Sequence, residues 1–318
     1  MKPRLGLLLG DRNGIGPELV ARLLADGDID DHAELVVIGD PRVFDQGRTI
    51  VGAGPVGLME FAPEPDAPIM PGEATAAAGR EMLVTLAHAA RMAEAGDLDG
   101  VVFAPLNKQA MHLGGLAFED EMRFLAHELK YDGTVGELNV LDDLWTSRVT
   151  SHVALRDVGD LITEPAVYDA IRFAHDALTA AGRAEPKLAV AALNPHAGDG
   201  GNFGREEIEV IGPAVERARR DGIDASGPHP SDTVFVKARD GAYAAVVTMY
   251  HDQGQIAMKL MGFGRGVTVL GGLPVPVTTC GHGTAYDIVG RGVANPESLR
   301  RAVMLCARMA ERREQDNG

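Results

Sequence analysis

Short apolar runs alternate along the chain with longer stretches in which apolar residues recur at helical spacing. The short runs are rich in small and β-branched residues, which is typical of buried strands, whereas the longer stretches are typical of helices. The predicted strands are 5–9, 34–40, 99–104, 148–155, 187–193, 243–247 and 266–272, and the predicted helices are 18–24, 73–96, 113–129, 164–181, 206–220 and 297–312. This alternation predicts a three-layer α/β architecture with much parallel sheet.

The first predicted strand leads into a glycine-rich turn, and a helical pattern follows. Gly10, Gly14 and Gly16 allow close approach of the backbone, and Pro17 suits a first helical turn because its missing N–H does no harm there. The glycines do not have the G-x-G-x-x-G spacing of a Rossmann dinucleotide site. We therefore expect a tight structural turn beside an active cleft.

Composition narrows the classes of protein that fit. The chain has 318 residues, 45% of them hydrophobic, which is enough for two lobes or one large α/β unit. Its net charge of -16 argues against a nucleic-acid partner, which clustered Lys and Arg would bind. Two cysteines, Cys280 and Cys306, exclude a disulfide framework and a thiolate zinc finger. No apolar segment is long enough for a signal peptide or membrane span, so we expect a bacterial-type cytoplasmic enzyme.

Histidines stand at or near the ends of three predicted strands. His251 and Asp252 follow the apolar run 244–247, His196 follows the strand 187–193, and His152 lies within 148–155. Each has a structural alternative, since His251 and Asp252 can simply bond to each other and His152 can be a sheet residue. Three imidazoles with open positions are nevertheless a common catalytic arrangement for zinc or a similar divalent ion.

Other polar side chains are candidates for contacts with a substrate or with the ion. Asp232, which we expect at the entry to a short strand, and Asp252 could orient the histidines or join the metal directly. Asn107 and Lys108 follow a predicted strand and are candidates for substrate contact, although Lys108 could equally be a solvated helix start. The acidic cluster around Glu121 suits the first turn of a helix for dipole reasons alone.

Several short motifs occur in an order along the chain that indicates a protein family more clearly than the spacing of single residues does. They are Gly10-Asp11, Gly14-Ile15-Gly16-Pro17-Glu18, Leu193-Asn194-Pro195-His196-Ala197-Gly198, Asp232-Thr233, Met249-Tyr250-His251-Asp252-Gln253-Gly254 and His282-Gly283-Thr284-Ala285. Together they resemble the 4-hydroxythreonine-4-phosphate dehydrogenase family over nearly the whole chain. That family is similar in fold to isocitrate and isopropylmalate dehydrogenases, which implies a two-lobed three-layer α/β/α architecture. The resemblance further implies a discontinuous cofactor-side lobe (1–126 and 265–318) and a metal-binding and dimerisation lobe (127–264).

The resemblance also implies roles for individual residues. His152, His196 and His251 would be the metal ligands, one of them crossing the interface of a homodimer with shared active sites. The cofactor, NAD or NADP, would be received at its adenosine end by His282, Gly283, Thr284, Ala285 and Asp287. Lys259 matches a substrate-contacting lysine of the family. A bound divalent ion would acidify the substrate alcohol as hydride leaves, with Asp232, Asp252 and Lys259 as candidates for the proton transfers.

The chain departs from the family at positions expected to meet a phosphate. The family's His and Thr fall on Glu121 and Met122, beside Arg123, and its Asn and Arg fall on Thr268 and Val277. Because a dianionic phosphate needs donors and positive charge, these changes predict an unphosphorylated hydroxy acid instead. These changes also make the chain similar to one branch of the family, whose members oxidise and decarboxylate the cis-dihydrodiol carboxylate of terephthalate breakdown.

The expected function is thus a metal-dependent NAD(P)-linked dehydrogenase of an unphosphorylated hydroxy acid, with decarboxylation. Two alternatives remain. One is a 4-hydroxythreonine-4-phosphate or phosphorylated tetronate dehydrogenase in which other residues, such as Arg123 or Arg265, hold the phosphate. The other is a homologue that binds NAD or a metal without catalysis.

Overall fold

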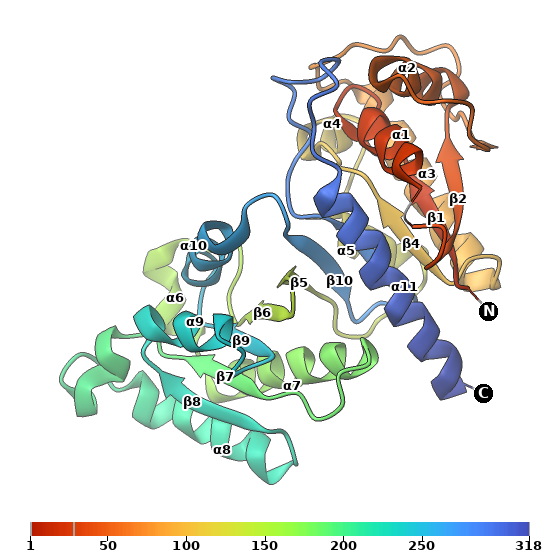
Figure 1. Cartoon of the computed structure of the whole chain (residues 1–318). Coiled ribbons are helices and arrows are strands. Elements are labelled where there is room, and N and C mark those ends of the chain that lie inside the picture. The colour runs from red at the N-terminus through yellow and green to blue at the C-terminus, as the bar shows by residue number, and fades with distance from the viewer. Residues whose placement is uncertain (1, 28, 318) are drawn as a thin grey trace. The chain divides into compact units, whose positions relative to one another are not determined.

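The chain is described from a computed structural model, which covers residues 2–27 and 29–317. Its residues divide into two compact units (Figure 1). Unit 1 comprises Met1–Gly136 and Val267–Gly318, and unit 2 comprises Glu137–Gly266. None of the helices in the described part of the chain is both long and apolar enough to span a membrane.

Unit 1 is built on a mostly parallel sheet. Its strands are β1 (Arg4–Leu8), β2 (Glu34–Gly39), β3 (Met59–Glu60), β4 (Gly100–Phe103), β10 (Val267–Gly271) and β11 (Val277–Cys280), and within the unit they run in the order β3-β2-β1-β4-β11-β10. Only the β10–β11 pair among them is antiparallel. Strands β1 and β4 are almost fully buried because helices cover both faces of the sheet.

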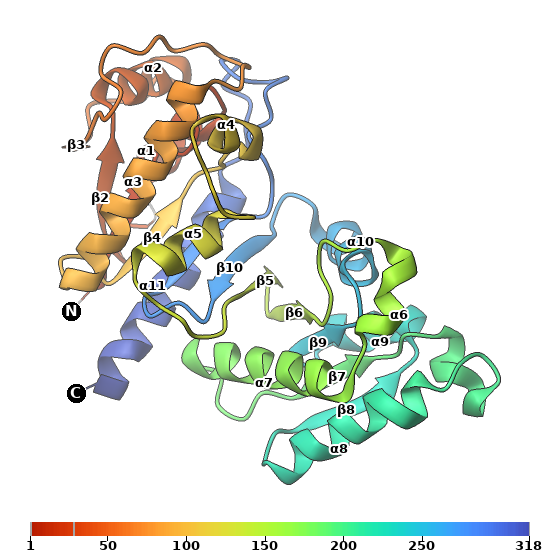
Figure 2. The same cartoon turned by 180° about the vertical axis from the view of Figure 1, so that it is seen from behind.

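Six helices complete unit 1 within the residues that the structure describes. They are α1 (Gly16–Asp26), α2 (Pro41–Val51), α3 (Ala76–Ala95), α4 (Lys108–Leu113), α5 (Glu121–Glu128) and α11 (Glu297–Asn317). Helices α1 and α11 cover one face of the sheet, whereas α3 and α5 cover the other (Figures 1 and 2). Asp40, Thr75 and Asp120 cap α2, α3 and α5 by accepting a hydrogen bond from a backbone N–H of the first turn.

Unit 2 repeats the layered arrangement around a second set of strands. These are β5 (Gly136–Leu141), β6 (Leu144–Arg148), β7 (Leu188–Ala191), β8 (Ala225–His229) and β9 (Ala245–Thr248), in the order β5-β6-β9-β7-β8. The β5–β6 hairpin is antiparallel and the remaining pairs are parallel.

The helices of unit 2 lie on both faces of its sheet. They are η1 (Leu155–Asp157), α6 (Val158–Leu161), α7 (Glu164–Ala180), η2 (Pro195–Gly201), the π-helix η3 (Glu207–Ile211), α8 (Gly212–Arg220), α9 (Ser231–Arg239) and α10 (His251–Gly262). Helices α7 and α8 cover one face, and α9 and α10 cover the other (Figures 1 and 2). The prediction of a three-layer α/β/α architecture is therefore confirmed.

Three local predictions are wrong. The strand predicted over 148–155 ends at Arg148, opposite the last residue of its parallel partner β9, Thr248. Of the described residues 149–155, only Val149 and Thr150 continue with single backbone bonds, to the Thr248 and Met249 carbonyls. Asp232 does not precede a strand but lies in the first turn of α9. The helix predicted over 113–129 begins only at Glu121 as α5, since α4 ends at Leu113, Gly114 and Gly115 follow it, and Asp120 caps α5.

Candidate active-site residues in the two units

The carboxyl ends of β1 and β4 form a topological switch point in unit 1. The chain leaves β1 toward β2 on one side, while β4 pairs with β1 on the other. The turn after β1 is tied to the segment after β4 by the Asp11 N–H, which donates to the Pro105 carbonyl at 3.0 Å. Crevices at such switch points are where open α/β sheets bind ligands.

The predicted cofactor loop packs directly on this glycine-rich turn. The Ile15 N–H donates to the Thr284 carbonyl at 3.1 Å, and the Asn107 side-chain amide reaches the Thr284 hydroxyl at 3.5 Å. A methyl group on Gly14 would lie 2.9 Å from Cβ of Thr284, so only glycine permits this approach. Asn107 also caps α4 through the Ala110 N–H. The loop 282–287 is thus held in the switch-point crevice.

Asp11 and Tyr286 form a contact that the sequence did not indicate as a site feature. The Tyr286 hydroxyl donates to Oδ2 of Asp11 at 2.5 Å, joining the glycine-rich turn to the cofactor loop. Burial raises the pKa of Asp11, and the hydrogen bond from Tyr286 only partly offsets that effect. Burial, followed by the bond to Asp11, also raises the pKa of Tyr286 above its usual value. The pair therefore fixes the two segments against each other.

Arg12 anchors the same turn inside a buried charged cluster, which the sequence also did not reveal. Its guanidinium lies 2.8 Å from Oδ2 of Asp40 and 3.0 Å from Oε2 of Glu81. Burial alone would raise the pKa of Asp40, but bonds and charge from Arg42 and Arg12 outweigh it and hold that pKa below its usual value. Burial raises the pKa of Glu81 to about 7 despite Arg12. The turn is therefore rigidly fixed.

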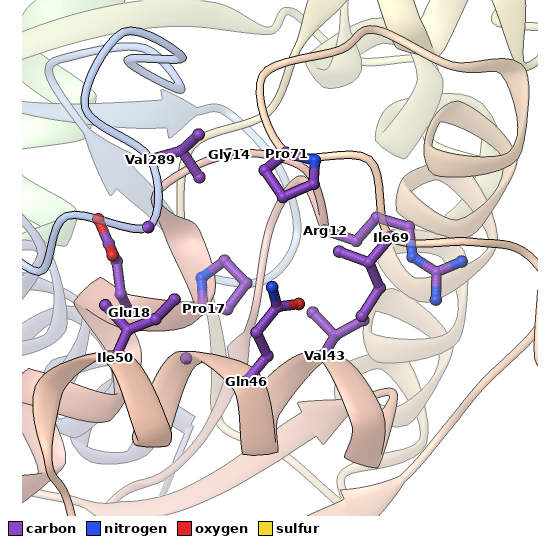
Figure 3. A pocket seen from close by; sticks show the side chains of 12 residues that line it. Arg12, Gly14, Pro17, Glu18, Val43, Gln46, Ile50, Ile69, Pro71 and Val289 are labelled. Carbon is purple, nitrogen blue, oxygen red and sulfur yellow. The ribbon is translucent and has the colours of Figure 1, made fainter.

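A shallow hollow of about 310 Å³, open to solvent, lies beside the cofactor loop (Figure 3). Val43 and Gln46 of α2 face Ile69 and Pro71 across it, with Val289 on a third side. Of the described residues that line the hollow, Arg12 carries the positive charge, and that charge is paired with two carboxylates. The Arg12 guanidinium is therefore not available to bind a phosphate in this hollow.

The predicted substrate residues of unit 1 fall in unlike surroundings. Met122 and Val277 pack in the hydrophobic core, at 3% and 1% exposure, and Glu121 at the start of α5 is also buried. Arg123 is ion-paired with its neighbours Asp120 and Glu119. Thr268 lies in β10, whereas Lys108 is exposed at the start of α4.

In unit 2 the structure brings two of the three predicted metal ligands together. The ring centroids of His152 and His251 are 5.8 Å apart. Two imidazoles that share one ion at nitrogen–metal distances of about 2 Å have centroids roughly 5–6 Å apart, so this spacing fits a bound divalent cation. Nδ1 of His251 lies 2.7 Å from Oδ1 of Asp252. A proton on Nδ1 would leave the Nε2 lone pair available to an ion.

His196 lies apart from that pair, in a loop with unusual backbone geometry. His196, Ala197 and Asp199 all have left-handed φ angles, of 54°, 53° and 46°. Non-glycine residues rarely adopt this region, and such strain is found mainly at functional sites. Among the residues that the structure describes, no three His, Cys, Asp or Glu side chains are grouped to hold a metal ion.

A buried carboxylate holds the His196 loop in place. Oε1 of Glu207 accepts hydrogen bonds from the backbone N–H groups of Leu193 and Asn194 at 2.9 and 2.7 Å. Its Oε2 accepts from the Asn194 side-chain amide at 3.0 Å. Glu207 begins the π-helix η3, a form of helix often found at functional sites. The sequence signal that could have pointed to it is a carboxylate that follows a glycine-rich loop.

The remaining predicted catalytic residues are accessible. Asp232 is exposed in the first turn of α9, and Lys259 is exposed on α10, two turns beyond His251. No described residue pairs with the Lys259 ammonium group. Asp252 is engaged with His251, so its surroundings differ from those of Asp232.

Comparison with known proteins gives this arrangement a family. The chain has an α/β fold of two units, with a loop at a switch point of one and two neighbouring imidazoles in the other. These features place it in the class of ligand-binding α/β proteins. A family model described as "Pyridoxal phosphate biosynthetic protein PdxA" matches residues 31–306. The chain belongs to this PdxA family, and the resemblance stated from its motifs is confirmed.

Relatives of known name cover almost the whole chain. A Pseudomonas aeruginosa protein, named provisionally as a second 4-hydroxythreonine-4-phosphate dehydrogenase, is 48% identical over 96% of this chain and 97% of its own length. The D-threonate 4-phosphate dehydrogenase of Pectobacterium atrosepticum is 35% identical over 98% of this chain and 100% of its own.

Solved structures give the same picture. The 4-hydroxythreonine-4-phosphate dehydrogenase of Klebsiella pneumoniae superposes with a TM-score of 0.85 at 33% identity, covering 98% of both chains. A terephthalate 1,2-cis-dihydrodiol dehydrogenase from Burkholderia xenovorans gives 0.67 at 30% identity, covering 96% of this chain and 98% of its own.

These relatives overturn the expected substrate class. An unphosphorylated hydroxy acid was predicted because Glu121, Met122, Thr268 and Val277 replace the family's phosphate contacts, yet the close relatives are named for phosphorylated substrates. The prediction is wrong, and the structure shows a weakness in its premise. Met122 and Val277 are core residues. Their side chains are apolar because they pack in the core, so they do not show which hydrogen-bond donors face a substrate.

Proposed function

We propose that this chain is a divalent-metal-dependent, NAD-linked dehydrogenase. Its substrate is a phosphorylated four-carbon hydroxy acid of the 4-hydroxythreonine 4-phosphate or D-threonate 4-phosphate class. The observation that carries the proposal is the pairing of His152 with His251, whose Nδ1 faces Asp252, in a chain whose relatives are named as dehydrogenases of such substrates.

The imidazoles suit a zinc site. Neutral nitrogen ligands with an open position are the usual set of catalytic zinc, which when bound lowers the pKa of a coordinated hydroxyl. Asp252 holds the proton of His251 on Nδ1 and so keeps Nε2 free. Since Asp252 has this orienting task, Asp232 and Lys259 are the groups proposed for the proton transfers that accompany hydride loss. Decarboxylation of the resulting 3-oxo acid is part of the proposal.

A lysine is proposed to bind the substrate's phosphate, and Lys108 and Lys259 are the two candidates. Lys108 and Lys259 are exposed, and no described residue pairs with either ammonium group. Arg123 and Arg265, by contrast, already contact the carboxylates of Asp120 and Asp142. A charge-assisted hydrogen bond to phosphate contributes about 1.5–3 kcal/mol, so a cation without a partner is the better donor.

The cofactor is proposed to bind at the switch point of unit 1. The loop of His282, Gly283, Thr284, Ala285 and Asp287 is seated there on the glycine-rich turn. The Asp287 carboxylate is exposed at its end. A carboxylate near the adenosine ribose accepts hydrogen bonds from its hydroxyls and repels a 2′-phosphate, which favours NAD over NADP.

The active unit is proposed to be a homodimer in which one histidine of each site comes from the second copy. Ile256 and Leu260 on α10 and Phe263 at its C-cap follow one another at helical spacing and are 60%, 84% and 71% exposed. Such an apolar stripe is typical of a surface buried by association. We therefore expect Leu260→Asp to shift the chain toward monomer in analytical ultracentrifugation. A dimer that persists unchanged would place the interface elsewhere.

The function is tested by NADH formation with a substrate panel. Metal-free protein and protein reloaded with Zn²⁺, Mn²⁺ or Mg²⁺ are each given 4-phosphohydroxythreonine and D-threonate 4-phosphate. Turnover that appears only with metal, together with release of carbon dioxide, is the expected result. Undiminished turnover in metal-free protein would overturn the metal dependence, and no turnover of either ester would overturn the substrate class.

A further inference from the structure

Gln253 is bonded to three separate segments of unit 2. Its Oε1 accepts a hydrogen bond from the Met249 N–H at 2.7 Å. Its Nε2 donates to the Ala192 carbonyl at 2.8 Å and to the Ser231 hydroxyl at 2.9 Å. The Ser231 hydroxyl in turn donates to the same Ala192 carbonyl at 2.7 Å. One side-chain amide thus joins the ends of β9 and β7 to the start of α9.

Each of these segments carries a residue of the proposed site. Met249 stands two residues before His251, Ala192 stands four residues before His196, and Ser231 is followed by Asp232. Hydrogen bonds of 2.7–2.9 Å leave the three backbones little freedom to shift against one another. The amide of Gln253 is therefore placed to set the spacing of these residues without touching a ligand itself.

We infer that Gln253 is a positioning residue that fixes the segments carrying His251, His196 and Asp232 against one another, so that each histidine is oriented for the metal site it joins. The inference rests on the proposed function, because it takes the histidines as ligands. It goes beyond the proposed function, since the choice of metal ligands does not require Gln253 to bond to the segments after β7 and at the start of α9.

The chemistry of these contacts calls for glutamine at this position. The amide uses its oxygen as an acceptor and its NH₂ group as a double donor, which a carboxylate cannot do. Glutamate would keep the bond to Met249 but lose both donated bonds, and it would place an anionic oxygen against the Ala192 carbonyl. Methionine has a similar length and no strong hydrogen-bonding group. The two substitutions therefore test the donors and the whole amide separately.

Loss of the amide is expected to weaken metal binding more than it weakens the fold. Replacing a residue that orients metal ligands without binding the metal itself typically lowers metal affinity about 10- to 100-fold. Ser231→Ala removes one of the amide's partners and leaves the bonds to Met249 and Ala192, so its effect should be smaller. A purely structural glutamine would lower the stability of the chain and leave the affinity of the folded protein unchanged.

The test is calorimetric titration of Zn²⁺ into the metal-free full-length chain. It uses the natural protein, Gln253→Glu, Gln253→Met, Ser231→Ala and the control Tyr168→Phe, which removes a hydrogen bond between Tyr168 and Asp221 on the outer helices. Urea unfolding of the same samples identifies how much of each is folded. We expect an affinity loss of about 10- to 100-fold in both Gln253 variants, a smaller loss in Ser231→Ala and none in Tyr168→Phe.

The outcomes separate the inference from the proposed function. Natural affinity in folded Gln253→Glu and Gln253→Met, together with loss of Zn²⁺ binding in His251→Ala, would overturn the role of Gln253 alone. Zn²⁺ binding that His251→Ala leaves unchanged would overturn the proposed metal site. Should Gln253→Glu fail to fold, Gln253→Met and Ser231→Ala decide the question, and natural affinity in both would contradict the inference.

Discussion

The glycine-rich turn of unit 1 and the histidine-bearing segments of unit 2 both follow the carboxyl ends of parallel strands, yet they are held differently. In unit 1 the Arg12 guanidinium is buried between the carboxylates of Asp40 and Glu81. In unit 2 the bonds come from the Gln253 amide and from Glu207, whose carboxylate faces backbone N–H groups. Charges in the turn neutralise one another, whereas in unit 2 the histidines stay available to a ligand.

This difference suggests a division of labour between the units. A turn locked by buried charge gives a rigid surface for a large cofactor, which needs shape more than reactivity. Exposed or half-exposed imidazoles on segments held by hydrogen bonds would give a reactive centre that an ion, a substrate or a second copy of the chain can reach. Variants in unit 2 should therefore alter metal binding and turnover, and variants in unit 1 should alter cofactor binding or stability.

The largest effect is expected from the histidines themselves. His152→Ala, His196→Ala and His251→Ala should each lower kcat/KM by about 10³-fold or more, because the ion that acidifies the hydroxyl is lost. The spacing of His152 and His251 predicts that His196 is the ligand from the second copy. Co-expressed His196→Ala and His251→Ala chains should then regain up to about one quarter of natural activity, since half of the dimers have one intact site.

Mixing the other pair supplies the control for that experiment. His152→Ala with His251→Ala should stay inactive, because both ligands belong to the same chain's half of the site. Recovery in this control would show that His152 or His251, and not His196, crosses between copies.

A smaller effect on the metal site is expected when the hydrogen bonds that hold the His196 loop are altered. Glu207→Gln puts an NH₂ group beside the Asn194 amide, which is itself a donor, and removes the charge that holds the left-handed loop. Zn²⁺ affinity should fall about 10- to 100-fold. Glu209→Gln, an exposed neighbour in the same π-helix, is the control. Equal affinities in the two variants would mean that the loop keeps its shape without Glu207.

In unit 1 the change with the sharpest steric reason is Gly14→Ala. The added methyl group would meet Thr284 at 2.9 Å and displace the cofactor loop. We expect the KM for NAD to rise about 10-fold, which corresponds to about 1.4 kcal/mol, while Zn²⁺ affinity is unchanged. Gly54→Ala is the control, because its methyl group meets no atom within 4 Å. An unchanged KM would separate the loop 282–287 from cofactor binding.

The smallest effect on activity, but a measurable effect on stability, is expected from Glu81→Gln. The pKa of Glu81 is raised to about 7 in the folded protein from 4.5 in the unfolded chain, so the folded state binds more protons between these pH values. The free energy of unfolding should therefore fall as pH rises from 4.5 to 7, by up to about 3 kcal/mol. Glu81→Gln should remove this slope in urea titrations at pH 5, 6, 7 and 8. A slope that survives the substitution would assign it to another group.

The sequence was informative where one local pattern decides the structure. Apolar runs predicted most strands, and the glycines and Pro17 predicted the turn before α1. Local pattern failed at His152, because where β6 ends depends on β9, a strand nearly a hundred positions away. It also mistook Asp232 for a residue before a strand, since helix and strand starts share the same polar residues.

The candidate site residues could be proposed one by one from the sequence, but the contacts that hold them in place could not. Histidines after strands suggest ligands without any knowledge of the fold. Nothing local indicates that Arg12 reaches Asp40 and Glu81, or that Gln253 bonds to Ala192, because these contacts join positions 28 to 69 residues apart. The substrate prediction failed for a similar reason, because matching a residue to a family position does not show where its side chain points.

The substrate class is tested most directly by comparing each phosphate ester with its own unphosphorylated acid. The measurement is kcat/KM for NADH formation by the Zn²⁺-loaded dimer with D-threonate 4-phosphate and D-threonate, and with 4-phosphohydroxythreonine and 4-hydroxythreonine. Two charge-assisted bonds to phosphate predict that one ester exceeds its parent acid by about 10³-fold. Equal values, or a preference for the acids, would contradict the account.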